Sequence, residues 1–288
     1  ILLLSYCCFK MPSDSAQAAP INEIKDVPVV ILCGGMGGRM GDIAKMLPKS
    51  LVPIQEYPIL WYIILSLYKE GFRTFVLPLG YRGQMIHEYV MSHLASLPNI
   101  RFQCIETGER THIAKRLELI KPSLSGERIL LLNGDAIFDF SVASLYQQHR
   151  ATGALVSLIS VELRSQWSLI LESDNQPYRF LRDHVVTYVA AKNAEQYRAY
   201  LYSGIAFLEL DAFNHINLSE CHEFENELFS SVINTEELAR LSANGFWFSV
   251  DTPKDAFVLN QLGNRDGDKI AKIKTELMRY LDISRGQS

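Results

Sequence analysis

Apolar and polar positions recur along the chain with two periods, which predict strands and helices in turn. Val29–Leu32 is a short, β-branched run typical of a buried strand. The apolar residues of 58–70 share one helical face, with proline early and glycine just past the end. Further strands are predicted at 75–79, 100–105, 128–132 and 153–161, and further helices at 84–97 and 141–150. Such alternation predicts an α/β fold, a mostly parallel sheet with helices on both faces.

After about residue 160 the apolar runs become shorter and are joined by polar turns. The pattern predicts strands at 168–172, 178–181, 185–189, 200–209 and 246–250, and helices at 223–233 and 254–262. Residues 193–199 fit a loop or a helical turn. We interpret 162–210 as a smaller β-rich lobe within a domain of residues 27–264. In the C-terminal helix, 265–288, an apolar stripe packs on its own domain or, less commonly, on another subunit.

The composition of the chain argues against several classes of protein. At 288 residues, 48% hydrophobic and 21% charged, the chain is long enough for one large domain of an ordinary soluble protein. A net charge of −4 gives no basic surface for nucleic acid. The five cysteines show neither metal-ligand spacing nor a paired framework, which indicates reduced thiols and a cytoplasmic location.

The first 26 residues do not resemble part of a domain. They begin apolar and reach Met11, a candidate start, before a polar run rich in Pro, Ser and Ala. A secretory signal would need a charged start and a longer apolar core. We interpret residues 1–26 as a flexible tail. Because no other segment approaches the roughly 20 apolar residues that cross a bilayer, we expect no membrane span.

A glycine-rich loop follows the first predicted strand. Four of its five positions are glycine: Gly34, Gly35, Gly37 and Gly38. Glycine is used this densely where something must approach the backbone closely, and exposed N–H groups after a parallel strand suit phosphate oxygens. Arg39 follows at once, and Lys49 lies ten residues further on. Two cations around such a loop predict a polyphosphate ligand.

Three known glycine patterns compete for this loop. The Walker pattern ends in Gly-Lys-Ser/Thr, which is missing here. The dinucleotide pattern would put Met40 in its last glycine position, and no acidic residue clearly ends the second strand, which disfavours an NAD-binding oxidoreductase. The sequence instead reads L-x-G-G-x-G-x-R, followed about ten residues later by P-K-x-L-V-P-I. This pair resembles the signature of the sugar-nucleotide pyrophosphorylases, which make NDP-sugars from an NTP and a sugar 1-phosphate.

Two aspartates end predicted strands. Asp135 follows Asn133-Gly134, and Asp251 follows the strand at 246–250. A triphosphate and an anionic acceptor need a divalent cation, for which carboxylates are suitable hard ligands. Each aspartate also has a simpler interpretation, Asp135 as the cap of a turn and Asp251 as the N-cap of the next helix. The glycine loop upstream favours the metal site.

Shorter motifs between residues 27 and 262 narrow the resemblance to the glucose-1-phosphate cytidylyltransferase branch, which makes CDP-glucose. They are Ile59-Leu60-Trp61, Gly80-Tyr81-Arg82-Gly83, Thr107-Gly108, Asn133-Gly134-Asp135, Gly245-Phe246-Trp247 and Asp251-Thr252. The resemblance implies a Rossmann-like nucleotidyltransferase fold in which Asp135 and Asp251 hold Mg²⁺. It places Arg39 on the triphosphate and Lys49 on the phosphates during transfer. The implied nucleotide-binding residues are Leu32, Gly34, Gly35, Gly37, Gly38, Thr107, Gly108, Arg116 and Gly134.

The chain departs from this branch at four places. Gly38 stands where the family has Thr or Ser, and Ala114-Lys115 stand where it has Gly-Gly. At the acceptor site, Arg182-Asp183 align with a Glu-Lys pair, and Tyr202 replaces an asparagine near Gly204. We expect Arg182, Tyr202 and Gly204 to bind the acceptor, with the Arg182 fork on its phosphate. A solvated surface arginine is the alternative for Arg182.

We therefore predict a metal-dependent nucleotidyltransferase that joins an NTP to a sugar 1-phosphate and releases pyrophosphate. CTP and glucose 1-phosphate are the expected substrates, no nucleic acid or membrane partner is expected, and a homo-oligomer is left open. Two alternatives stay open: a non-catalytic nucleotide or sugar-nucleotide sensor that kept the fold, and a nucleotidyltransferase with a non-sugar phosphate acceptor. The acceptor-site departures motivate the sensor, whereas the intact Arg39, Lys49 and aspartates count against it.

Overall fold

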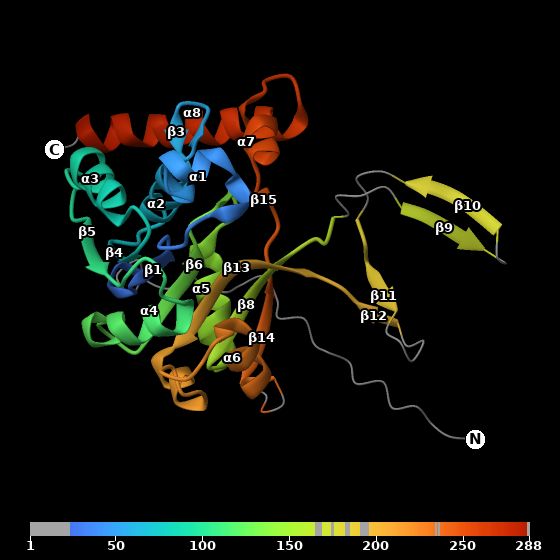
Figure 1. Cartoon of the computed structure of the whole chain (residues 1–288), viewed down its shortest axis with the longest axis horizontal. Coiled ribbons are helices and arrows are strands. Elements are labelled where there is room, and N and C mark those ends of the chain that lie inside the picture. The colour runs from blue at the N-terminus through green and yellow to red at the C-terminus, as the bar shows by residue number, and fades with distance from the viewer. Residues whose placement is uncertain are drawn as a thin grey trace.

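A seven-stranded mixed sheet forms the centre of the computed structural model (Figure 1), which describes residues 24–164, 169–173, 176–181, 185–190, 196–233, 235 and 237–286. Its strands are β1 (Val29–Leu32), β4 (Thr74–Leu79), β5 (Arg101–Glu106), β6 (Arg128–Asn133), β8 (Val156–Val161), β13 (Leu201–Glu209) and β14 (Leu238–Ser242). They lie in the order β14-β8-β13-β6-β1-β4-β5. Of these seven, β13 runs antiparallel to both neighbours, and the other pairs are parallel. The predicted mostly parallel α/β sheet is confirmed.

Helices cover both faces of the sheet because its buried strands send alternate side chains to opposite sides. In β1, Val29 and Ile31 join one core cluster, while Val30 joins the other. The first cluster is covered by α2 (Ile59–Lys69), α3 (Gly83–His93), α5 (Val142–Thr152) and α8 (Arg265–Gly286). The second is covered by α4 (Ile113–Ile120), η5 (Leu210–His215) and α6 (Phe224–Val232).

Short elements complete the domain around the strand ends. They are η1 (Ile24–Asp26), η2 (Gly38–Met40), α1 (Asp42–Met46), η3 (Lys49–Leu51), β2 (Pro53–Ile54), β3 (Tyr57–Pro58), η4 (Lys121–Ser123), β7 (Ala136–Phe138), β15 (Trp247–Ser249) and α7 (Pro253–Asn260). β2 pairs with β3 and β7 with β15 as small antiparallel ribbons. No helix in the described part of the chain is long and apolar enough to span a bilayer.

The second half of the chain differs from the sequence prediction at three points. The predicted lobe includes the strand at 200–209, but β13 lies in the main sheet between β6 and β8, and most of it is buried. Within the described residues, the lobe consists of two hairpins that extend away from the sheet (Figure 1), β9 (Leu169–Ser173) with β10 (Gln176–Leu181) and β11 (Tyr188–Ala190) with β12 (Gln196–Arg198). β12 replaces the predicted loop or helical turn, and β14 was not predicted.

The two ends of the domain are fixed by buried apolar side chains. On α8, Ile270, Ile273 and Leu277 are at most 5% exposed and join the core cluster under α2. The stripe of this helix therefore packs on its own domain, as predicted. At the other end, Ile24 is buried in the same cluster, ahead of the predicted domain start at residue 27. The rest of the predicted tail, residues 1–23, lies outside the described residues.

Candidate active site

The candidate site lies at the carboxyl ends of the neighbouring parallel strands β1 and β6, the edge where ligands of α/β sheets bind. The glycine loop follows β1, and Asp135 follows β6. Asp251 comes from far along the chain, and the β7–β15 pairing brings it here. Directly beyond that ribbon, the Val250 amide donates to the Asp135 carbonyl at 2.9 Å. Two sequence-distant aspartates are thus held side by side by backbone hydrogen bonds.

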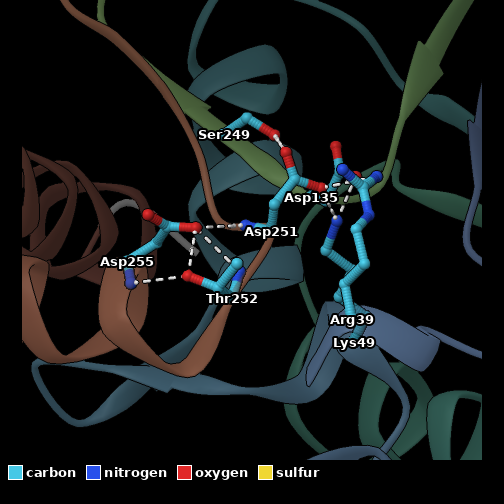
Figure 2. A network of polar contacts seen from close by, with 7 residues as sticks. All are labelled: Arg39, Lys49, Asp135, Ser249, Asp251, Thr252 and Asp255. Carbon is cyan, nitrogen blue, oxygen red and sulfur yellow. Dashed lines mark hydrogen bonds and ion pairs between the residues drawn. The ribbon is translucent and has the colours of Figure 1, made fainter. Parts of the chain in front are cut away.

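Four predicted residues form one network of ion pairs (Figure 2). Lys49 Nζ donates to Asp135 Oδ2 at 2.6 Å and to Asp251 Oδ1 at 2.7 Å. Arg39 Nη2 lies 2.9 Å from the same Asp251 Oδ1. The two predicted metal ligands and the two predicted phosphate-binding cations therefore meet at one point.

Asp251 does not cap the following helix, so that alternative is wrong. The N-cap of α7 is Thr252, whose Oγ accepts from the Asp255 amide at 3.3 Å. Asp255 closes the capping box by accepting from the Thr252 amide at 2.7 Å, and it also accepts from the Asp251 amide at 3.0 Å. The Asp251 carboxylate is left to face the site.

The charge state of Asp251 follows from its neighbours. Burial by itself would raise the pKa of its carboxyl group. The hydrogen bond and charge of Lys49, the charge of Arg39 and a 3.1 Å hydrogen bond from Ser249 Oγ outweigh burial and lower that pKa below its ordinary value. Asp251 is therefore anionic at neutral pH and suited to a cation.

The pair of aspartates fits a divalent metal of the Mg²⁺ type. Mg²⁺ is commonly bound by one or two carboxylates together with substrate phosphates, and seldom by an all-protein cage. Asp135 and Asp251 already converge on one cationic atom, Lys49 Nζ. Among the described residues, no group of three or more His, Cys, Asp or Glu side chains could hold a metal ion. The two aspartates would hold it, and phosphate and water oxygens would complete its coordination.

A side chain would be crowded or strained at three glycines around the site, Gly34, Gly37 and Gly134. A Cβ on Gly34 would lie 2.5 Å from Arg116 Nη1 and 2.8 Å from the Pro78 carbonyl. Gly37 has φ of +60°, and a Cβ there would lie 3.3 Å from Lys49 Cβ. A Cβ on Gly134 would lie 3.1 Å from the Leu32 carbonyl. At Gly35 and Gly38 an added Cβ would meet nothing within 4 Å, so these two positions leave the backbone open to a ligand.

Arg116 lies beneath the loop and is only 3% exposed. Its guanidinium donates to the carbonyl of Gly34 at 2.9 Å, to the carbonyl of Leu79 at 3.2 Å and to Thr107 Oγ1. These acceptors belong to the end of β1, the end of β4 and the turn after β5, where Gly108 has φ of +91°. Arg116 therefore links the ends of three strands through buried hydrogen bonds. Contacts of Thr107, Gly108 and Arg116 with a nucleotide remain predictions.

A cavity of about 680 Å³ opens beside the ion-pair network. Asp135, Asp251 and Arg39 lie on its wall, together with Tyr202 and Gly204 from β13, two predicted acceptor residues. The third, Arg182, lies outside the described residues, so its role remains a prediction.

Asn133, Glu225 and Trp247 also line this cavity. Asn133 and Trp247 belong to motifs that carry the family resemblance, whereas sequence reasoning missed Glu225. Burial, and then the negative charge of Asp135, raise the pKa of Glu225 above its ordinary value. Trp247 Nε1 donates to the Ser203 carbonyl at 3.0 Å, which holds the indole ring in the wall. No local pattern marks Glu225, because a glutamate in a first helical turn is common.

Gly204→Ala should lower the free energy of unfolding by about 1–3 kcal/mol, because φ here is +74° and a Cβ would lie 2.6 Å from Asn133 Nδ2. Gly153→Ala is the matched control, since φ there is +68° but an added Cβ meets nothing within 4 Å. Urea denaturation of both variants separates backbone strain from the clash with Asn133. Equal losses would show that Gly204 serves only its backbone conformation.

The fold and the grouped charges together define the class, an α/β protein with a glycine loop after its first strand and paired aspartates at neighbouring strand ends. Residues 28–261 match the family described as nucleotidyl transferase, and the chain belongs to that family.

Two similar proteins and one solved structure carry different substrate names. The "probable glucose-1-phosphate cytidylyltransferase" of Bacillus subtilis (strain 168) is 26% identical over 262 residues, which cover 85% of this chain and 98% of that protein. The "probable mannose-1-phosphate guanylyltransferase 2" of Oryza sativa subsp. japonica is 25% identical over 84% of this chain and 67% of its own length. A Bacillus anthracis structure, described as a "putative glucose-1-phosphate thymidylyltransferase" in complex with sucrose, has the same fold. Its TM-score is 0.62 at 15% identity, and the match covers 83% of this chain and 97% of that one.

Proposed function

We propose that this nucleotidyltransferase joins an NTP to a sugar 1-phosphate, giving an NDP-sugar and pyrophosphate. The observation that carries the proposal is the convergence of Lys49 and Arg39 on Asp135 and Asp251. Two cations and two carboxylates at strand ends, next to an open glycine backbone, suit a triphosphate with its metal. Relatives named for glucose 1-phosphate and mannose 1-phosphate support a sugar-phosphate acceptor.

Each group has a defined task in this reaction. A divalent metal held by Asp135 and Asp251 would neutralise charge on the reacting phosphates. Arg39 binds the outer phosphates of the NTP. Lys49 stabilises the phosphates during transfer, and the backbone N–H groups around Gly35 and Gly38 donate to phosphate oxygens. The acceptor phosphate is already ionised near neutral pH, so no side chain has to remove a proton. Rate acceleration then comes from alignment and from electrostatic stabilisation.

CTP and glucose 1-phosphate are our first candidate substrates, because the Bacillus subtilis relative is named for them and the match to this chain covers 98% of that protein. Guanylyl and thymidylyl relatives show that the family name does not determine the base. The test is a screen for pyrophosphate release with Mg²⁺, four NTPs, several sugar 1-phosphates and several non-sugar phosphates. Turnover with CTP and glucose 1-phosphate supports the proposal. If only a non-sugar phosphate gives turnover, the acceptor is that phosphate and not a sugar 1-phosphate. If nucleotide binds but no pair of substrates gives turnover, the protein is a sensor.

Arg39→Ala should weaken binding of the NTP by about tenfold, the expected loss of one charge-assisted hydrogen bond to an outer phosphate. Binding of the matching nucleoside monophosphate should hardly change, because it lacks the phosphates that Arg39 is assigned to bind. Titration calorimetry with both ligands measures the difference. Lys45→Ala is the control, since Lys45 is a similarly exposed cation nearby whose partner is Asp42 at 2.7 Å. Equal losses for the two nucleotides would place Arg39 elsewhere.

A further inference from the structure

Lys49 is the most enclosed member of the ion-pair network, with a side chain only 16% exposed, against 25% for Asp135 and 30% for Asp251. Its ammonium donates to one oxygen of each aspartate at 2.6 and 2.7 Å. Arg39 approaches the same Asp251 oxygen from the solvent side, where its side chain is 75% exposed. One oxygen of each carboxylate is thus paired with a cationic side chain of the protein itself.

A metal ion placed between Asp135 and Asp251 would compete with Lys49 for the two oxygens that face it, Asp135 Oδ2 and Asp251 Oδ1. Mg²⁺ sits at about 2.0–2.1 Å from its oxygen ligands, so it and the Lys49 ammonium cannot occupy the space between the two carboxylates together. A metal ion that enters this space would displace Lys49 and compete with Arg39 for Asp251 Oδ1. Lys49 and Arg39 then need other anionic partners, and the phosphates of a bound nucleotide can supply them.

We propose that Lys49 and Arg39 are internal counter-ions that occupy the metal position, and that metal and phosphates take it over together. The idea rests on the proposed function, in which both ligands bind here. In this exchange the divalent ion takes the aspartate oxygens while the phosphates take the two cations. Binding of metal and binding of phosphate therefore favour each other, and the coupling is reciprocal. The protein by itself binds divalent ions weakly, although it carries two converging carboxylates.

The first test is Mn²⁺ binding to the protein without nucleotide, measured by electron paramagnetic resonance of unbound Mn²⁺. Lys49→Met keeps most of the side-chain volume but removes the competing ammonium. Its Kd for Mn²⁺ should fall by about tenfold or more, which corresponds to about 1.4 kcal/mol. Arg164→Met is the matched control: Arg164 lines the same cavity, but its ion pair is with Glu162 at 3.0 Å. A general effect of losing one positive charge would appear in both variants.

The second test reverses the exchange and does not depend on the folding of Lys49→Met. Asp251→Asn removes the carboxylate that holds both cations, so pyrophosphate in EDTA should bind this variant about tenfold more tightly than wild type. Asp266→Asn is its control, because Asp266 is another carboxylate of the cavity wall. Titration calorimetry gives both dissociation constants.

The exchange is overturned if Lys49→Met binds Mn²⁺ no better than wild type, or no better than Arg164→Met. It is also overturned if pyrophosphate affinity in EDTA is the same for Asp251→Asn and wild type. Neither measurement needs an acceptor or turnover. An enzyme that turns over while both affinities stay unchanged refutes the exchange alone, whereas shifted affinities without turnover refute only the proposed reaction.

Discussion

Asp135→Asn and Asp251→Asn should each reduce pyrophosphate release by about 1,000-fold or more, because each removes a charged oxygen from the shared metal position where transition-state charge has to be neutralised. The amide keeps the shape of the side chain but is a poor ligand for a hard cation. The melting temperature should change little, since Lys49 keeps one carboxylate partner in either variant. Initial rates at saturating substrates, together with thermal melts, measure the two effects separately.

Asp42→Asn is a suitable control for these two variants. Its carboxylate is 88% exposed and paired with Lys45, and it is not among the residues lining the cavity. It should therefore retain wild-type rates. A rate close to that of wild type in either Asp135→Asn or Asp251→Asn would refute the shared metal position.

Arg116→Met should lower the free energy of unfolding by about 3 kcal/mol, because it removes the charged, buried donor of three acceptors, and a hydrogen bond to a charged group contributes about 1.5–3 kcal/mol. Those acceptors are the carbonyls of Gly34 and Leu79 and the hydroxyl of Thr107. Urea denaturation, with the m-value checked for two-state behaviour, measures the loss.

Two further variants isolate the reason for this loss. Arg116→Lys should recover little of it, since one ammonium cannot reproduce a planar fork that reaches three strand ends. Arg110→Met, at an exposed position a few residues earlier, should stay within about 0.5 kcal/mol of wild type. If Arg116→Met proves as stable as the Arg110 control, the hydrogen bonds of Arg116 do not stabilise the fold, and the predicted nucleotide contact becomes its main role.

Much of the first half of the fold could be predicted from the sequence because its signals are local, although no helix was predicted at α4. Val29–Leu32, the stripe of α2 and the glycine loop each carry their evidence within about a dozen residues. The grouping of the glycine loop with Asp135 also followed, since carboxyl ends of parallel strands meet at one edge of the sheet. The placing of Asp251 beside them rested on the family resemblance, because Asp251 follows β15, which belongs to a separate antiparallel ribbon. The shared hydrogen bonds of Lys49, however, depend on distances that no sequence pattern specifies.

Other features depend on contacts between distant segments. The composition of β13 would fit a strand of the lobe as well as a central strand of the sheet. Only its pairing with β6 and β8 shows that it is a central strand. Arg116 was interpreted from its motif as a nucleotide contact. Its burial follows from α4, where Ala114, Leu117 and Ile120 turn the same side of the helix toward the sheet. The cavity wall combines residues of β6, β13, α6 and β15, which are far apart in the sequence, and no local periodicity connects them.

The distance along the chain between the paired charges has a consequence for synthesis. Lys49 is 86 residues from Asp135 but 202 residues from Asp251. During translation the N-terminal part of the chain is made first, so the glycine loop, Lys49 and Asp135 emerge long before their last partner. Between the synthesis of residue 135 and that of residue 251, the nascent protein carries the loop and one carboxylate of the site. The site gains its second carboxylate only when β15 emerges and pairs with β7, so an interrupted chain would end without it.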